Sequence, residues 1–130
     1  MAAPETPKRS ILLVEDDEAL RTVLTTVLDR AGFAVTPIRL AQEVPQMLGL
    51  SAPDLMVLDL VMPSGTMQGA ELLAWLREAD AWRHLPVVIL SGYGDVANRD
   101  IMARLGAATI LTKPLADIEI LPRTVRAILR

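Results

Sequence analysis

The chain has 130 residues, 52% of them hydrophobic and 22% charged, and its formal net charge of −3 gives no electrostatic reason to expect nucleic-acid binding. It contains no cysteine, which excludes disulfides, thiolate zinc sites and cysteine nucleophiles. Its sequence contains neither an apolar stretch of signal-peptide length nor one long enough to span a membrane, so we expect a cytoplasmic protein that binds no membrane.

The first nine residues, MAAPETPKR, combine two prolines with mixed charge and predict a flexible tail (1–9) ahead of a single domain (10–130). Five short apolar runs follow. They are rich in Val, Ile and Leu, which is typical of parallel strands covered on both faces. The predicted strands are ILLV (11–14), AVTPI (34–38), LMVLDL (55–60), VVILSG (87–92) and ATILTKP (108–114).

Helical patterns alternate with these strands. The clearest is an apolar stripe from Ala19 to Ala31, which Gly32 closes as a C-terminal cap. A less regular helix covers Gln42 to Leu50, where Pro45 is tolerated only in the first turn. The remaining helices are predicted over Glu71 to Ala79, Val96 to Leu105 and Val125 to Leu129.

Strand and helix thus alternate five times. This alternation predicts an α/β fold with three layers, a doubly wound (βα)5 arrangement in which helices cover both faces of a five-stranded parallel sheet. Trp75 and Trp82 are expected to pack against that sheet, and His84 to lie exposed in a loop.

Polar residues gather where the predicted strands end. Ligands bind at this edge of an open parallel sheet. Crowded carboxylates repel one another and resist dehydration, so they require a cationic partner. Oxygen ligands from Asp16, Asp17 and Asp59 suit Mg²⁺, and Lys113 adds a second positive charge. The full set is Glu15, Asp16 and Asp17 after the first strand, Asp59 on the third, Ser91 and Gly92 on the fourth, and Thr112, Lys113 and Pro114 on the fifth.

Once its charge is offset, Asp59 can act as a nucleophile toward phosphorus. Lys113 and the Ser91 hydroxyl would then bind phosphoryl oxygens, and Gly92 would let its backbone N–H approach closely. Each residue taken alone has an ordinary explanation: Asp17 as a helix N-cap, Asp59 and Ser91 as turn residues, and Lys113 as a solvated side chain. Their convergence on one edge favours a functional site.

These motifs resemble those of the receiver domain of two-component response regulators. The resemblance implies a flavodoxin-like sheet of order 2-1-3-4-5. It also implies a phosphorelay phosphoprotein that takes a phosphoryl group onto Asp59 from a sensor histidine kinase or histidine phosphotransfer protein and is not itself an enzyme. The segments that carry the likeness are EDD (15–17), DLVMP (59–63), LSG (90–92) and TKP (112–114).

The same resemblance implies the cofactor Mg²⁺, held by Asp16, Asp59 and the backbone carbonyl of Val61, with Asp17 close by or reaching it through water. It implies a cis peptide between Lys113 and Pro114. Phosphorylation would draw Ser91 inward and rearrange the surface of the fourth helix, fifth strand and fifth helix, which would bind a downstream protein that the sequence does not specify.

Three features depart from the family pattern. The segment MPSGTMQG (62–69) is about two residues longer than the usual turn. Ile110 stands where many receivers place a mobile Tyr or Phe, and Tyr93 is a weak candidate to replace it. AATIL (107–111) lacks the acidic residues of one common dimer contact. Val61 and Tyr93 also flank the path of hydrolytic water, which predicts slow dephosphorylation.

Several functions remain open. We expect either a stand-alone receiver or one excised from a longer transcription factor or hybrid kinase. A phosphatase of the haloacid-dehalogenase type would require a second acid two residues after the nucleophile, where this chain has Val61. A degenerate receiver acting as a constitutive binding module is disfavoured because Asp59, Ser91 and Lys113 are all present.

Overall fold

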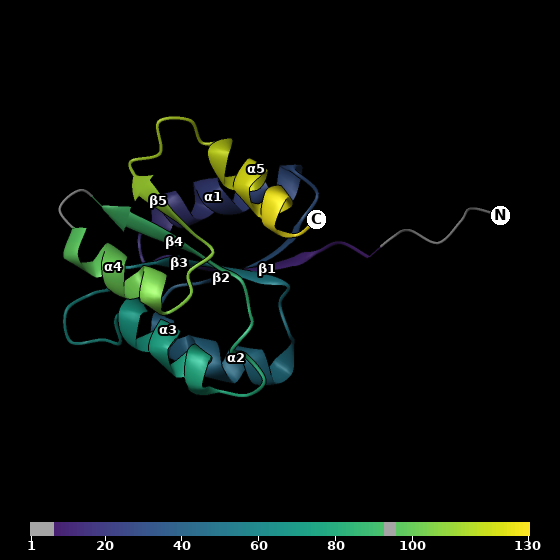
Figure 1. The fold of residues 1–130 in the computed structure, drawn as a ribbon. Helices are drawn as coiled ribbons and strands as arrows, with labels where there is room; N and C mark the ends of the chain where they lie inside the picture. Colours follow the sequence, from purple (N-terminus) through teal and green to yellow (C-terminus); the bar gives the residue numbers. More distant parts are fainter. Residues whose placement is uncertain (1–6, 93–95) are drawn as a thin grey trace.

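A computed structural model describes residues 7–92 and 96–130 of the chain. Five parallel strands form one sheet in the order β2-β1-β3-β4-β5, which confirms the predicted topology (Figure 1). Because the order reverses beside β1, the C-terminal ends of β1 and β3 flank the crevice in which such sheets bind ligands. The strands are β1 (Ser10–Val14), β2 (Ala34–Ile38), β3 (Leu55–Asp59), β4 (Val87–Gly92) and β5 (Thr109–Lys113).

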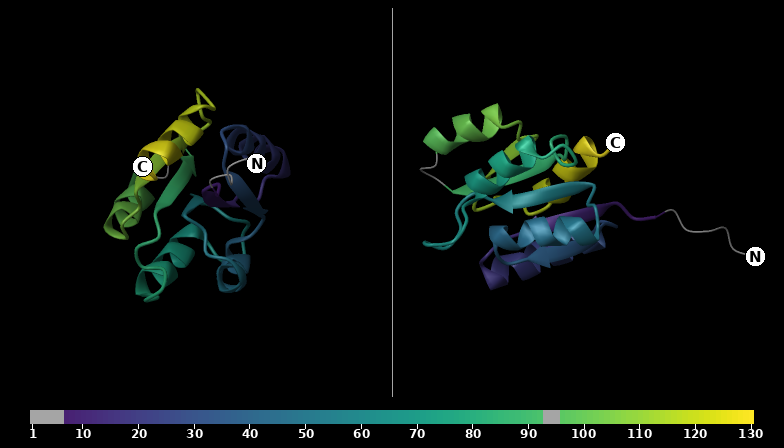
Figure 2. Two further views of the ribbon diagram at one scale, coloured as in Figure 1. Left: turned by 90° about the vertical axis from the view of Figure 1, so that its right-hand side faces the viewer. Right: turned by 90° about the horizontal axis from the view of Figure 1, so that it is seen from below.

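Helices cover both faces of the sheet (Figures 1 and 2). One face carries α1 (Glu18–Arg30) and α5 (Ile120–Ile128). The other carries α2 (Val44–Leu50), α3 (Gly69–Glu78) and α4 (Val96–Arg104). None of the helices in the described part of the chain is both long and apolar enough to cross a bilayer.

The strands build a separate apolar core on each face of the sheet. Leu12 and Val14 of β1 pack on the α2–α3–α4 side, whereas Ile11 and Leu13 pack on the α1–α5 side. β3 and β4 repeat this alternation. Since every apolar residue of these strands finds a core on one side or the other, their sequences read as apolar runs.

The starts of α2 and α5 differ from the predicted ones at a proline, and those of α1 and α3 differ by one and two residues. α5 begins at Ile120, five positions before the predicted Val125, and includes Pro122 in its first turn. A first-turn residue has no intrahelical partner for its N–H, so a proline there loses nothing. Likewise α2 begins at Val44 with Pro45 in its first turn, after a short 3₁₀ turn at Ala41–Glu43.

The two tryptophans differ in their environment. Trp82 is half-buried against the α2–α3–α4 core, as predicted, and His84 is exposed in its loop. The prediction for Trp75 is wrong, because this side chain is 41% exposed on α3. It lies at the border of the stripe formed by Leu72, Leu73 and Leu76, which fill the space over the sheet.

The start of α3 lies directly against the end of β3. The Gly69 N–H donates to the Leu60 carbonyl at 3.1 Å, and a Cβ atom at Gly69 would lie 2.7 Å from the Asp59 carbonyl oxygen and 2.9 Å from that of Leu60. Both neighbours are backbone atoms, so neither can move aside without displacing Asp59. Glycine is therefore required here for close approach.

Replacing Gly69 with alanine should lower the free energy of unfolding by about 2 kcal/mol, because the added methyl group overpacks a backbone contact. Urea unfolding followed by circular dichroism measures this change. Gly49→Ala is the matched control. Its Cβ would meet nothing within 4 Å, so it should raise stability by about 0.5 kcal/mol through helix propensity. Equal effects at both positions would contradict the steric explanation.

Candidate functional site

Lys113 joins two carboxylates that come from different strands. Its Nζ donates to Asp59 Oδ2 at 3.1 Å and to Glu15 Oε1 at 3.2 Å. Glu15 is fully buried and Asp59 nearly so, while about a quarter of the Lys113 side chain remains exposed. The C-terminal ends of β1, β3 and β5 thus bring one ammonium and two carboxyl groups into direct contact, in the crevice that the strand order predicts.

Asp16 completes an acidic group beside this ion pair. One carboxylate oxygen from each of Glu15, Asp16 and Asp59 lies within 4.8 Å of the others. Glu15 Oε2 is buried and finds no hydrogen-bond partner among the described residues. Buried acceptors are normally satisfied, so this oxygen indicates a missing donor or cation. An all-oxygen donor set with excess negative charge fits a hard divalent ion such as Mg²⁺.

Burial and close contact shift the pKa values of the groups in this site. Burial, and next the adjacent Asp59 carboxyl group, raise the pKa of Glu15 to about 8. Burial alone lowers the pKa of Lys113, but attraction to Asp59 and Glu15 outweighs it, so the pKa of Lys113 lies above its ordinary value. Glu15 therefore holds its proton more tightly than an exposed glutamic acid does, chiefly because it is buried.

The structure places Glu15, rather than Asp17, next to Asp59. Asp17 is exposed, and its Oδ1 accepts a hydrogen bond from the Leu20 N–H at 2.9 Å as the N-cap of α1. The N-cap interpretation of Asp17 is confirmed. Glu15 continues the pairing of β1, since its N–H donates to the Ile38 carbonyl, and this extension aims its side chain into the site.

Arg21 is a further residue that the sequence did not single out. Its Nη1 donates to the carbonyl oxygens of Glu15 at 2.9 Å and of Asp16 at 3.3 Å. A cation on the first turns of α1 thus fixes the backbone that carries both acids. The sequence does not predict this role, because Arg21 bonds to backbone carbonyls, which every residue type has.

Ser91 and Gly92 end β4 beside Lys113. Ser91 is buried and pairs in register with Thr112 of β5, and Gly92 pairs with Lys113. The Lys113–Pro114 peptide is cis, as the resemblance implied. On the neighbouring helix, Arg99 Nη2 donates to Thr112 Oγ1 at 2.6 Å and so ties α4 to this strand. Tyr93 lies outside the described residues.

The family model described as "Response regulator receiver domain" matches residues 11–125 of the chain. This chain belongs to the response regulator receiver domain family. Its five-stranded sheet of order 2-1-3-4-5 is the sheet that this assignment requires. The receiver domain carries its buried ion pair and acidic group at the strand ends where the family motifs fall.

Known proteins support this assignment. The receiver domain is 37% identical over 122 residues to the transcriptional regulatory protein GltR of Pseudomonas aeruginosa, covering 94% of this chain and 49% of GltR. It is 34% identical over 111 residues to an uncharacterized 14.6 kDa protein of Leptolyngbya boryana, covering 85% and 83% of the two chains. The chain thus spans about half of GltR but most of the second relative.

Solved structures agree with the fold. The signal receiver domain of a signal transduction histidine kinase from Syntrophus aciditrophicus superposes with a TM-score of 0.83 at 30% identity, covering 93% of this chain and 89% of that one. A response regulator receiver protein from Pseudomonas putida superposes with a TM-score of 0.85 at 25% identity, covering 95% and 99%. Receiver domains of this shape therefore occur both in kinases and in regulators.

The raised pKa of Glu15 predicts how stability depends on pH in metal-free buffer. The folded receiver domain holds a proton at Glu15 more tightly than the unfolded chain, so its free energy of unfolding should fall as pH rises from about 5 to about 8. Chemical unfolding with a chelator present measures this slope. Glu15→Gln should flatten it, whereas Glu18→Gln, an exposed neighbour, should leave it unchanged; a slope that persists in Glu15→Gln would contradict the assignment.

Proposed function

We propose that this receiver domain accepts a phosphoryl group on Asp59 in a Mg²⁺-dependent reaction and thereby switches a protein-binding surface. One observation carries the proposal: Lys113 contacts Asp59 directly within an acidic group that is short of positive charge. A merely structural ion pair would not need a third carboxylate, Asp16, at the same point. A bound cation would complete the charge balance, and together with Lys113 it would then offset the negative charge of an incoming phosphoryl group.

In the proposed transfer, an Asp59 carboxylate oxygen attacks the phosphorus of a phosphohistidine. The new O–P bond forms as the N–P bond breaks, and the released imidazole takes up a proton from solvent. Lys113 Nζ already contacts Asp59 and would pair with a phosphoryl oxygen as negative charge moves outward. Ser91 and Gly92 are the last residues of β4, and the Ser91 hydroxyl and Gly92 N–H would donate to the remaining phosphoryl oxygens.

The donor set for Mg²⁺ in this proposal is Asp16, Asp59 and the Val61 carbonyl, with Glu15 as the neighbouring acid. When bound, the ion would supply positive charge that offsets the phosphoryl oxygens. Asp17 is left as the N-cap of α1, because its carboxylate already accepts from the Leu20 N–H. The orphaned Glu15 Oε2 is the contact in this chain that a bound cation, or its water, would satisfy.

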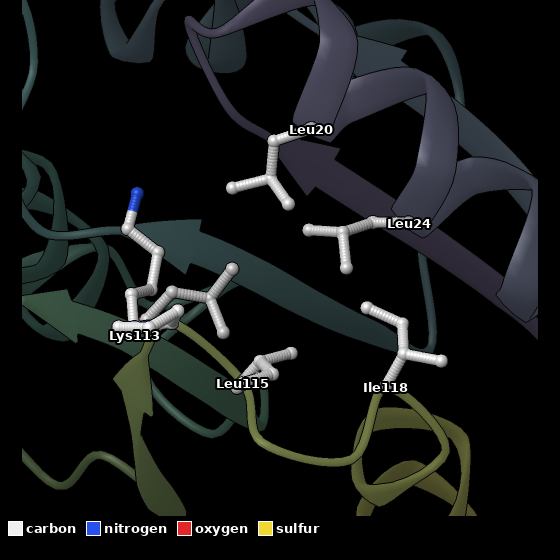
Figure 3. Close-up of a pocket in the computed structure, with 7 residues that line it drawn as sticks. Leu20, Leu24, Lys113, Leu115 and Ile118 are labelled. Carbon is white, nitrogen blue, oxygen red and sulfur yellow. The ribbon is translucent and has the colours of Figure 1, made fainter.

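The phosphodonor is proposed to be a histidine kinase or histidine phosphotransfer protein that covers the edge beside Lys113. An apolar hollow of about 410 Å³ opens there between α1 and the segment joining β5 to α5. Figure 3 shows Leu20 and Leu24 of α1 facing Leu115 and Ile118, with Lys113 at one end. An amphipathic helix that presents a histidine near its apolar face would fill this hollow and reach Asp59.

The surface proposed to switch is formed by α4, β5 and α5. Ile110 is half-buried against the α2–α3–α4 core. Because isoleucine has neither a ring nor a polar group, it cannot act as a mobile tyrosine or phenylalanine would. Arg99 contacts Thr112, the register partner of Ser91 on the adjacent strand β5, and so provides a different link between the site and α4. Slow hydrolysis remains part of the proposal, because the apolar Val61 side chain follows Asp59 by two residues.

Phosphorylation is tested by incubating the protein with acetyl phosphate and Mg²⁺ and measuring its intact mass. We expect one added phosphoryl group, which is absent when the metal is chelated and absent in Asp59→Asn. Asp54→Asn is the matched control, because Asp54 lies beside β3 at the opposite end of the strand and bonds to Ser10. Modification that survives in Asp59→Asn, or turnover of an aryl phosphate, would refute the proposal.

Metal ligation separates the two neighbouring aspartates. Asp16→Asn should weaken Mg²⁺ binding by about tenfold or more, because it removes a charged ligand, whereas Asp17→Asn should change it less than about twofold, because asparagine also caps helices. A Mg²⁺ titration followed by amide NMR shifts gives both dissociation constants. If Asp17→Asn weakens Mg²⁺ binding as much as Asp16→Asn does, Asp17 is also a ligand and the prediction is wrong.

A further inference from the structure

Gln68 is the last residue before α3, and its side chain holds in place the long segment 62–69 that leads into this helix. Its side-chain Oε1 accepts from the Met62 N–H at 2.9 Å, and its Nε2 donates to the Met62 carbonyl at 3.1 Å. Nε2 also lies 3.3 Å from the carbonyl oxygens of Pro63 and Thr66. The amide of Gln68 thus pairs with both backbone groups of Met62, as the next strand of a sheet would.

This pairing determines how the Val61 carbonyl is oriented. The carbonyl of Val61 and the N–H of Met62 belong to one planar trans peptide group, so they point in opposite directions. When Gln68 Oε1 fixes the N–H, it fixes the carbonyl as well. The Val61 side chain is 53% exposed and provides no anchor of its own, whereas the Met62 side chain is buried.

The peptide before Val61 is also fixed. The Leu60 N–H donates to the Leu90 carbonyl at 2.9 Å, and the Leu60 carbonyl accepts from Gly69 at 3.1 Å. The Val61–Met62 peptide is thus restrained on one side by the sheet and the start of α3, and on the other by Gln68. Of these two restraints, Gln68 is the one that acts on the N–H group of that peptide directly.

We propose that Gln68 is a positioning residue for the Mg²⁺ site: it holds the Val61 carbonyl in the orientation in which that oxygen serves as a ligand. This inference rests on the proposed function, in which the Val61 carbonyl contributes to the donor set. The hydrogen bond also polarises the peptide, which increases the negative charge on the Val61 oxygen and strengthens its attraction to a cation.

The length of the loop explains why such a residue is needed. A longer loop has more conformations to lose when it is ordered. This one turns at Pro63–Thr66, where the Thr66 N–H donates to the Pro63 carbonyl and Gly65 has a φ of +83°. That turn orders the middle of the loop but does not reach the Val61–Met62 peptide, which depends on Gln68.

A second glutamine provides a matched control. Gln42 Oε1 accepts from the Met67 N–H at 3.2 Å, so it ties down the same loop without touching the Val61–Met62 peptide. Gln68→Met and Gln42→Met remove the same functional group and keep a similar side-chain volume. Their effects on Mg²⁺ binding separate the orientation of one carbonyl from general ordering of the loop.

The experiment measures two quantities in wild type and both variants. The first is hydrogen exchange at the Met62 amide in metal-free buffer, and the second is the Mg²⁺ dissociation constant from an NMR titration. Gln68→Met should speed exchange at Met62 and weaken Mg²⁺ binding by about tenfold. Gln42→Met should leave Met62 exchange unchanged and shift the dissociation constant less than about twofold.

Three results would overturn the inference. Equal loss of Mg²⁺ affinity in both variants would show that loop order, not the Val61 carbonyl, matters. Faster exchange at Met62 with unchanged Mg²⁺ affinity would refute the positioning role alone. A wild-type protein that binds no Mg²⁺ would refute the proposed function itself, and the role of Gln68 with it, whatever the exchange rates.

Discussion

Lys113 places one positive charge between two buried carboxylates that β1 and β3 contribute, and the arrangement of the site depends on this contact. Two acids so close together at low solvent exposure would repel one another without it. The ion pair spans three strands that are far apart along the chain, so it can form only when the sheet has its correct order. Folding and assembly of the site are therefore one event.

The same contact leaves the charge balance incomplete, and the proposed function depends on this imbalance. Three carboxylates face one ammonium group, and Glu15 responds by holding its proton to a pKa of about 8. A fully neutralised cluster would gain little from a cation or an anionic group. Here the excess of carboxyl groups favours a bound cation, which in the proposed function would in turn attract a phosphoryl group.

Much of this organisation could be read from the sequence, because unbroken apolar runs and the polar residues that end them are local signals. The run VVILSG predicts β4 with the bounds that the structure has, and the strand-end pattern correctly predicts that Asp59 and Lys113 lie together. The sequence favours Asp17 over Glu15 as the acid beside Asp59. A carboxylate just before a helix can be either an N-cap or a ligand, and only the geometry shows which it is. Arg21 and Gln68 act through backbone atoms, which leave no trace in residue type.

The close approach of Gly69 to the Asp59 carbonyl makes the α3 side of Asp59 stiffer than its α4 side. On the α3 flank, backbone meets backbone at van der Waals distance, so any displacement of Asp59 is resisted at once. On the α4 flank, the described contacts with the sheet run through side chains, Met102 and Arg99, which can change rotamer. If Asp59 is phosphorylated as proposed, the resulting strain would therefore relax toward α4, so close backbone packing on one side would give the switch its direction.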